Sequence, residues 1–463
     1  MKHTLVWLQR NLRLADNPAL QWALSHSETV LLLYLHSPTD EAPWQHGAAS
    51  CWWLQQSLGT LQQAATAKGL TLNLLRGDAL EIIPQLIAHQ QIDAISWQRN
   101  YEPHLAHRDR QLTEVLSQQD IIINISNDGL LPDPDTLLTG KGTPYRVFTP
   151  FYRQLRKRLY YDTESPQSND SLNNIRSINL PDSLSLSALG LLKPHPWQEN
   201  LAQHNRPGEA AAQQQLERFI NERLVDYPAK RDLPAVDASS QLSAALHIGE
   251  VSARQILAAL QPLLEHGSTE EASAAESFLR QVIWREFARY ILWHFPATSE
   301  QCMDQRFKPA FWHHDKTMMT RWQRGETGVT IIDAGMRQLW QSGTIHNRVR
   351  MLAASFLTKN LNQPWQLGAH WFWQTLVDAD LANNSMGWQW VAGCGVDASP
   401  YFRIFNPDTQ AIRFDPQGSY RKKWLGDRDL ATTKPIVDIA DSRKQALARY
   451  QQYIKNQSTR SAP

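Results

Sequence analysis

The stretch DADLANNSMGWQW, residues 378–390, contains two acidic, three amide and two tryptophan side chains and no basic residue. Carboxylates and amides cost free energy when they are buried without partners, and tryptophan favours burial with an acceptor for its indole N–H. A buried helix–loop junction would account for such a run. Of the 18 tryptophans in the chain, however, 11 follow residue 280. This density favours a C-terminal half that uses indole rings as stacking surfaces or as a path for electrons.

The bulk composition is typical of a soluble globular protein with more than one domain. A chain of 463 residues is too long for one typical core. Hydrophobic residues make up 42% and charged residues 20% of the chain, as in ordinary globular proteins. The formal net charge is only +1, so any affinity for nucleic acid has to come from a local basic patch.

The three cysteines, Cys51, Cys302 and Cys394, lie far apart in the sequence. They form no CxxC pair and cannot supply the four thiolates of an iron–sulfur cluster, and we predict no metal site. Few cysteines fit a reducing compartment. The N-terminus shows no charged leader with an apolar segment and a cleavage site, and no apolar run reaches the ~18 residues of a membrane span. We therefore expect a cytoplasmic protein.

Residues 1–130 alternate short apolar runs with helical patterns. Near-continuous apolar strands between helices predict a parallel sheet covered on both faces, a doubly wound α/β domain, and ligands bind such sheets at the carboxyl ends of their strands. No GxGxxG motif is present. The predicted strands are Thr4–Leu8, Thr29–Leu35, Leu70–Leu75, Ile92–Trp97 and Ile121–Ile125, and the predicted helices are Pro18–Leu24, Ala48–Ala67, Ala79–His89 and His104–Gln118.

The rest of the chain divides into a connector and an all-α domain. Residues 131–205 are predicted as an interdomain linker, because Thr163–Leu186 is rich in Ser, Asn, Asp and Pro. Residues 206–463 show apolar spacing of three and four residues without strand alternation. The clearest helical runs are Gly208–Leu224, Ser252–Glu265, Ala272–Phe295 and Val329–Ser342.

Several segments, in the same order, resemble signatures of the photolyase/cryptochrome family, and residues 378–390 resemble its flavin-contact segment. The resemblance spans about residues 3–430 and is closest to bacterial class I cyclobutane pyrimidine dimer photolyases. It implies an α/β antenna-binding domain followed by an all-α FAD-binding domain. The other segments are Trp7–Asn17, Ile283–Phe287, Asp333–Arg337, His346–Met351 and Tyr401–Pro407.

A serine-rich segment, residues 237–243, precedes the helical run that starts at Ala244. Hydroxyls and free N–H groups at a helix start can hold phosphate oxygens, although such serines usually only cap the helix. The resemblance implies that this segment binds the pyrophosphate of FAD. It also implies the full set of cofactor-binding residues: Tyr227, Ser239, Ser240, Leu242, Ser243, Trp284, Arg285, Asn347, Arg350, Asp378, Asp380 and Asn384.

Asn384 matches the family position that faces flavin N5. A neutral amide tolerates an anionic reduced flavin, whereas a carboxylate would repel it, so Asn384 favours an electron-donating flavin. We expect Arg350 to form an ion pair with Asp378. By the same resemblance, Trp388, Trp365 and Trp312 form an electron path from the flavin to the surface, and most other tryptophans are core residues.

The resemblance also implies a pocket for a flipped-out lesion. Trp284 and Trp390 match its two ring surfaces, Asn347 its amide and Met351 an apolar contact, while Arg348 is a candidate phosphate ligand. The runs Arg156–Arg158 and Arg421–Lys423 are candidate basic edges for the DNA, or simply solvated charge.

Gln281 departs from the family pattern, because most cyclobutane-dimer photolyases have Glu at this position. A protonated carboxyl group can donate to the lesion and stabilise its radical anion, whereas Gln cannot transfer a proton. Photolyases for (6-4) photoproducts do carry Gln here, but they have a His-His pair where this chain has His346-Asn347.

The sequence therefore predicts a light-driven deoxyribodipyrimidine photolyase that binds UV-damaged DNA as a monomer and repairs cyclobutane dimers. Its predicted catalytic residues are Gln281, Asn384, Trp388, Trp365 and Trp312. The alternatives are a cryptochrome-like blue-light photoreceptor and a (6-4) photolyase. For the antenna we expect methenyltetrahydrofolate, with 8-hydroxy-5-deazaflavin as the alternative. Glu102 could contact a pterin ring or be an ordinary surface residue.

Overall fold

A computed structural model describes residues 1–127, 129–161, 176–193, 197–398, 402–426 and 434–455. Residues 163–175 of the predicted linker and Tyr401 of the family-like segment lie outside these ranges. In the described part of the chain, no helix combines the length and hydrophobicity that crossing a bilayer requires.

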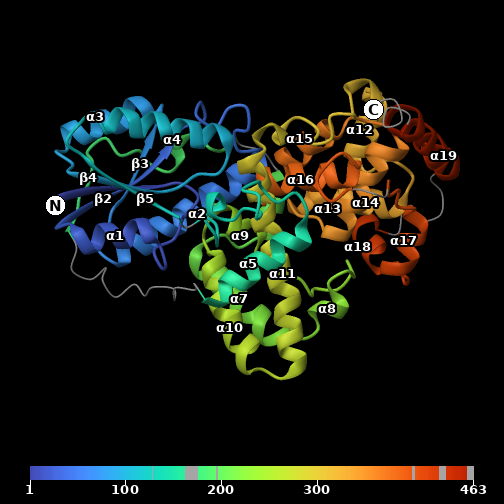
Figure 1. Ribbon diagram of the computed structural model, residues 1–463, viewed down its shortest axis with the longest axis horizontal. Helices are drawn as coiled ribbons and strands as arrows, with labels where there is room; N and C mark the ends of the chain where they lie inside the picture. Colours follow the sequence, from blue (N-terminus) through green and yellow to red (C-terminus); the bar gives the residue numbers. More distant parts are fainter. Residues whose placement is uncertain (128, 162–175, 194–196, 399–401, 427–433, 456–463) are drawn as a thin grey trace.

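The N-terminal part is the predicted doubly wound sheet. Its strands are parallel in the order β3-β2-β1-β4-β5, and a short strand, β6 (Arg176–Ser177), pairs with β2. Figure 1 shows helices α3 and α4 on one face of the sheet and α1 on the other. The bounds are β1 (His3–Leu8), β2 (Thr29–His36), β3 (Leu72–Arg76), β4 (Ala94–Gln98), β5 (Ile122–Ser126), α1 (Pro18–His26), α2 (Ala48–Ala67), α3 (Ala79–His89) and α4 (Pro103–Leu116).

Local sequence explains these boundaries. The Asn17 side chain accepts a hydrogen bond from Leu20 N at the start of α1, and Pro18 occupies the first helical position, where its missing N–H costs nothing. Strand β2 is buried over nearly its whole length, as a strand covered by helices on both faces must be.

The C-terminal half is helical, as predicted. The long helix α11 (Thr269–His294) starts with a capping box formed by Ser268 and Glu271 and rises from the lower edge of the molecule beside α10 in Figure 1. The other helices that position the site are α7 (Glu209–Glu222), α8 (Tyr227–Lys230), α9 (Ser243–Ile248), α10 (Ala253–His266), α12 (Lys316–Arg324), α13 (Thr330–Ser342), α14 (Asn347–Ser355), α15 (Trp365–Thr375), α16 (Leu381–Ala392), α17 (Pro407–Phe414), α18 (Ser419–Leu425) and α19 (Ile439–Tyr450).

The segment predicted as a linker contains a buried helix, α5 (Phe148–Tyr161). Phe148, Phe151 and Leu155 are at most 1% exposed and pack in one core cluster with Phe287 and Tyr290 of α11. Residues 148–155 therefore belong to the core of the helical half. The polar stretch that follows obscured the apolar spacing of this helix in the sequence.

The two halves are joined through buried main-chain and charged contacts. Gly249, which ends α9, has φ +84°, and a Cβ at this position would lie 2.0 Å from Arg10 O. Arg13 Nη1 donates to Gly249 O at 3.0 Å, and Asp16 pairs with Arg254. We call these contacts the domain seam. They hold the start of α1 directly against the end of α9.

Candidate functional site

The helix α16 has one face that borders open space, although it lies in the middle of the helical half. It packs against α11, α14 and α15, yet Asn383 and Gly387, one turn apart, are exposed. A Cβ at Gly387 would meet no atom within 4 Å. This face of α16 is therefore open and is not covered by other parts of the described chain.

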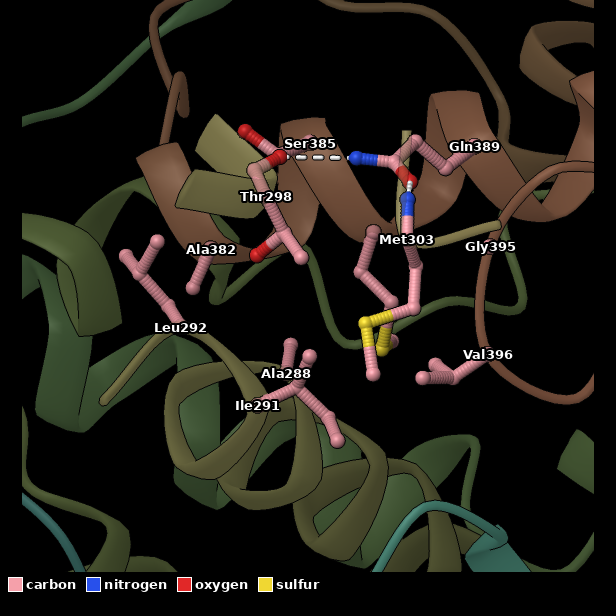
Figure 2. Close-up of a pocket in the computed structure, with 11 residues that line it drawn as sticks. Ala288, Ile291, Leu292, Thr298, Met303, Ala382, Ser385, Gln389, Gly395 and Val396 are labelled. Carbon is pink, nitrogen blue, oxygen red and sulfur yellow. Dashed lines mark hydrogen bonds between the residues drawn. The ribbon is translucent and has the colours of Figure 1, made fainter. Parts of the chain in front are cut away.

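The opposite face of α16 is closed. Ala382, Ser385 and Gln389 face α11 across a small pocket of about 10 Å³ (Figure 2). Such a volume holds at most one water molecule, so this pocket is a packing gap and not a ligand site. Gln389 Nε2 donates to Thr298 O at 2.7 Å, and its Oε1 accepts from Met303 N at 2.8 Å, which fixes the loop after α11 to α16.

Two carboxylates flank the start of α16. Both oxygens of Asp378 accept from Arg350 Nη2, at 3.0 and 2.8 Å, so the expected ion pair is present. Asp380 caps α16 by accepting from Asn383 N at 2.9 Å and pairs with Arg289 at 3.0 Å. Burial alone would raise the pKa of Asp380, but Arg289 and His247 hold it well below its usual range, and the carboxylate is therefore ionised.

Arg285 lies one turn before Arg289 on α11 and is held by Glu286 at 2.7 Å. Burial, followed by the nearby Arg289 charge, lowers the pKa of Arg285 to about 10. The guanidinium thus remains cationic at neutral pH. Together with Arg289 and Arg350 it gives this part of the site three guanidinium groups, each paired with a carboxylate.

The serine-rich segment lies where the sequence placed it, directly before α9. Ser243 is the first residue of α9 and is exposed, Ser239 and Ser240 are half-buried, and Leu242 is buried. Gln241 has a φ of +55°, which turns the chain into the helix. Hydroxyls and N–H groups of this turn are available to an anionic group. Tyr227 is buried against Phe219 and Phe278.

These residues fit FAD. The exposed amide face of α16, the carboxylates that pair with arginines and the serine turn before α9 supply groups for an isoalloxazine, a ribose and a pyrophosphate. The open space at Gly387 is room that a side chain would otherwise fill.

The three tryptophans of the expected electron path share one core cluster. The ring of Trp388 lies against α15 at Gly368, where a Cβ would be 2.1 Å from its Cη2 atom. Trp365 begins α15 and is fully buried, and its Nε1 donates to Cys302 Sγ at 3.3 Å. Trp312 is 8% exposed, the most of the three, and its neighbour His313 N donates to Asn362 O at 2.8 Å.

The expected lesion pocket has two half-buried indoles. Trp284 stacks on Phe148 with a centroid distance of 3.6 Å and an interplanar angle of 5°, so one of its faces is covered by protein. The Arg403 guanidinium lies over the Trp390 ring, with its Cζ atom 5.1 Å from the ring centroid. Asn347 and Met351 lie one turn apart on α14, with Asn347 exposed and Met351 half-buried. Gln281 is half-buried, and its Nε2 lies 3.5 Å from Ser277 O.

Arg348 contacts protein groups, and its role as a phosphate ligand stays a prediction. Its Nη2 pairs with Asp232 at 2.8 Å, and its guanidinium lies 4.4 Å from the Phe414 ring centroid. In the basic runs, Arg156 pairs with Glu276 and Arg421 with Asp415, while Lys157 and Lys423 are exposed.

A second crevice lies where the strand order reverses, between β1 and β4, which is where doubly wound sheets bind ligands. It is lined by Arg10, Asn100, Tyr101 and Glu102 and by Arg289 and Asp380 of the helical half, and encloses about 20 Å³. Glu102 is half-buried and pairs with Arg10 at 3.6 Å, so the surface position expected for it was wrong. With these side chains in place the enclosed space suits a water molecule and not a pterin.

Several residues of the site escaped the sequence analysis. Arg289 could have been found, because it lies four residues after Arg285 on a helical pattern and therefore on the same face. Phe148 and His247 carry no local signal, and Gln389 was counted only as one of the amides of residues 378–390. Their roles depend on which elements meet in three dimensions.

Comparisons with known proteins agree with this architecture. Residues 4–169 match the model of the DNA photolyase family and residues 278–432 the model described as the FAD-binding domain of DNA photolyase. A deoxyribodipyrimidine photo-lyase of Agrobacterium fabrum is 38% identical over 448 residues, which cover 96% of this chain and 91% of the relative. Cryptochrome-2 of Arabidopsis thaliana is 32% identical and covers 92% of this chain and 70% of its own.

A solved structure also matches this chain over nearly its full length. The crystal structure of a bacterial class III photolyase from Agrobacterium tumefaciens has a TM-score of 0.91 and 36% sequence identity, with 98% of each chain covered. The sequence motifs predicted class I, and the subclass of this chain stays a prediction. The helical site, the parallel sheet and the matches over nearly the full length lead to one conclusion: this chain belongs to the DNA photolyase family.

Proposed function

We propose that this protein repairs cyclobutane pyrimidine dimers in DNA and uses light as the source of energy. FAD bound at α16 would supply the chemistry, because its photoexcited reduced form can give one electron to a dimer and take it back after the ring has split. The observation that carries the proposal is the exposed amide face of α16 beside two arginine-paired carboxylates. The names of the relatives support the same reaction.

Asn384 is suited to a reduced flavin. Its Nδ2 donates to Ala369 O at 3.0 Å, which leaves the side-chain oxygen free to accept. A reduced flavin presents an N–H donor at N5, and an uncharged acceptor there does not repel the negative charge of the ring. Asp380 stays ionised beside Arg289, Asp378 pairs with Arg350, and the serine turn before α9 would receive the pyrophosphate.

The lesion pocket would be formed by the free face of Trp284, the Trp390 ring, and the Asn347–Met351 pair. Enzymes that act on bases inside a duplex flip them out and stack them against aromatic or apolar side chains. Phe148 stacks on one face of Trp284 and fixes the orientation of its ring. The other face of the ring can then stack on a base. Gln281 would contribute an amide hydrogen bond to the dimer but no proton.

A (6-4) photolyase is less consistent with the site. His346 caps α14, where its Nδ1 accepts from Arg348 N at 3.2 Å. Burial, opposed only in part by Asp232, lowers the pKa of His346 to about 4. A histidine that is neutral at physiological pH and occupied as an acceptor is a poor proton donor. A cryptochrome-like photoreceptor is the second candidate, because Gln281 weakens the repair chemistry and cryptochromes are among the relatives.

A repair assay tests the proposal. The purified protein with chemically reduced flavin is illuminated with an oligonucleotide that contains a thymine dimer, and thymine absorbance is followed. We expect the absorbance to recover over many turnovers. If it does not recover although the flavin is present and reduced, the lyase is excluded and the photoreceptor is supported. An oligonucleotide with a (6-4) photoproduct is the matched control and should stay unrepaired.

For the other partners we propose a monomer in the bacterial cytoplasm that contacts damaged DNA through exposed lysines such as Lys157 and Lys423. Methenyltetrahydrofolate is the antenna that we expect, with 8-hydroxy-5-deazaflavin as the alternative. Either would have to displace the Arg10–Glu102 pair if it enters the crevice between β1 and β4. The absorption spectrum of the purified holoprotein distinguishes the two pigments.

A further inference from the structure

Two buried cysteines lie beside the middle tryptophan of the electron path. Cys302 Sγ accepts the indole N–H of Trp365 at 3.3 Å. Cys302 is 7% exposed and Cys394 is fully buried. Cys394 lies close enough to Cys302 for the two thiols to interact, so an indole and two sulfur atoms lie together.

The backbone holds the two cysteines together. Asp304 N donates to Cys394 O at 2.8 Å. Gln389 holds both segments, since its Oε1 accepts from Met303 N at 2.8 Å and its main-chain O accepts from Cys394 N at 3.1 Å. The sulfur pair is thus fixed by several bonds to α16, the helix that carries Trp388.

A buried lysine completes the group. Lys359 is 1% exposed, and its Nζ donates to Ala392 O at 2.5 Å. Burial lowers the pKa of Lys359 well below its usual range, although the nearby Cys394 raises it. The hydrogen bond from Cys394 is the main cause that lowers the pKa of Cys302. The amine lies near a thiol pair in which one sulfur gives up its proton more readily.

We propose that Cys302 and Cys394 form an internal dithiol that donates electrons to Trp365 after light has oxidised this tryptophan. The proposal rests on the electron path through Trp388 and Trp365 in the proposed function. In this proposal the two thiols reduce the flavin once per chain when no external reductant is present. The proposed repair reaction does not require this step, because it begins from flavin that is already reduced.

The reaction balances over two photochemical events. Bound flavin, oxidised and excited by light, would be the oxidant that removes one electron from Trp365 through Trp388. Cys302 then returns an electron to the indole and loses its proton. The sulfur radical then bonds to Cys394, which loses its proton, and the second electron leaves for Trp365 after its next oxidation. Two S–H bonds break, one S–S bond forms, and two electrons reach the flavin. Of the two thiol protons, one balances the proton that flavin takes up on two-electron reduction, and the other is released to solvent.

A thiol count tests the proposal. The holoprotein with oxidised flavin is freed of small thiols, kept without oxygen and illuminated with blue light. The flavin band is followed, and then the unfolded protein is titrated for free thiols. We expect the flavin to be reduced and the free thiols to fall from three to one per chain, since two of the three cysteines become linked. Peptide mass analysis should find Cys302 joined to Cys394, and a sample kept dark should retain all its thiols.

Three variants separate the dithiol from a merely structural role. Cys302→Ser keeps an acceptor for the Trp365 N–H but cannot supply the electron, and it should reduce flavin at least about tenfold more slowly without external thiol. Cys394→Ser should behave alike, and added dithiothreitol should restore both. Cys51→Ser is the matched control, since Cys51 lies on α2, and it should retain the wild-type rate.

The proposal is overturned if the wild-type flavin is reduced while all three thiols remain, or if Cys302→Ser keeps the wild-type rate. Trp365→Phe distinguishes this failure from one of the proposed electron path. If Trp365→Phe reduces its flavin at the wild-type rate, the proposed electron path is wrong. If Trp365→Phe loses photoreduction but Cys302→Ser keeps it, only the role of the dithiol is wrong. Repair by chemically reduced Cys302→Ser should be normal, because it does not need the dithiol.

Discussion

Gln281 is the residue at which a single substitution is expected to improve the proposed repair reaction. Its amide has only a long contact to Ser277 O, at 3.5 Å, so a carboxyl group can replace it without the loss of a strong bond. We expect Gln281→Glu to raise the quantum yield of dimer repair, because a protonated carboxyl stabilises charge on the dimer better than an amide. The yield is measured from thymine absorbance at equal photon dose. Gln281→Leu is the control and should repair less than the wild type; a Glu variant that repairs no better would contradict the role given to this position.

Gln389 is predicted to matter for stability more than an ordinary glutamine. Its side chain is buried and satisfies Met303 N, Thr298 O and Gln301 O. Each buried group left unpaired costs about 1–3 kcal/mol, so Gln389→Leu should lower the free energy of unfolding by on the order of 3 kcal/mol.

Urea unfolding measures this change. Gln366→Leu is the matched control, because Gln366 makes a single hydrogen bond, to Glu300 O, in an exposed place. A loss below about 1 kcal/mol in Gln389→Leu, similar to that expected for an exposed bond, would show that the loop after α11 is held by other contacts.

At the scale of elements, the contact between α15 and α16 depends on the absence of a side chain. The Trp388 ring fills the space beside Gly368. We expect Gly368→Ala to cost about 1–3 kcal/mol through overpacking and to slow flavin photoreduction, since the displaced ring belongs to the proposed electron path. Thermal unfolding of the flavin-free protein and photoreduction under continuous light are the two measurements.

Gly387→Ala on α16 is expected to cause no overpacking, in contrast to Gly368→Ala. No atom lies within 4 Å of its added Cβ, and alanine favours a helix over glycine by about 1 kcal/mol. The flavin-free protein should therefore unfold at the same temperature or a higher one. Equal destabilisation by both substitutions would show that the two glycines do not differ in their surroundings.

The elements themselves were predictable where one strong local signal decides them. Ala48–Ala67 and Ala79–His89 were predicted with the bounds of α2 and α3, because their apolar residues recur with helical spacing. The all-α second half followed from the same signal. Helix α5 was missed, since its Phe148 and Phe151 face α11, a partner more than 100 residues away.

The pairings of the site residues could likewise be predicted only where local chemistry determines the partner. Opposite charges made the Arg350–Asp378 pair an expectation, and the structure contains it. The stacking of Trp284 on Phe148 and the contact of Trp365 with Cys302 join segments far apart in the chain. Pairings of this kind are decided by packing, which no local pattern encodes.

At the scale of the whole molecule, the junction of the two halves contains a buried carboxyl group. Glu250 accepts from Trp53 Nε1 of α2 at 3.2 Å and from Gly208 N at 2.7 Å. Burial raises the pKa of Glu250 from 4.5 to about 7. A group whose pKa is raised by folding stabilises the fold fully below its unfolded pKa, and this contribution is lost as pH rises through the folded pKa.

We therefore expect the stability of the wild type to fall between about pH 4.5 and pH 7 by up to ~3 kcal/mol from this group. Glu250→Gln is neutral at every pH and should lose this part of the pH dependence, so that it becomes more stable than the wild type above pH 7. Urea unfolding at pH 5 and pH 8 measures the difference. Glu265→Gln, an exposed control, should leave the profile unchanged; parallel profiles for the wild type and Glu250→Gln would exclude the effect.

The close main-chain approach at Gly249, together with the Arg13 and Asp16 contacts of the domain seam, fixes the spacing of the two halves. A pigment carried by the sheet would then keep a constant separation and tilt toward anything bound beside α16. Resonance transfer of excitation falls steeply with separation and depends on relative orientation. Different pigments could therefore be exchanged in the sheet over evolution while the optical coupling geometry stayed the same.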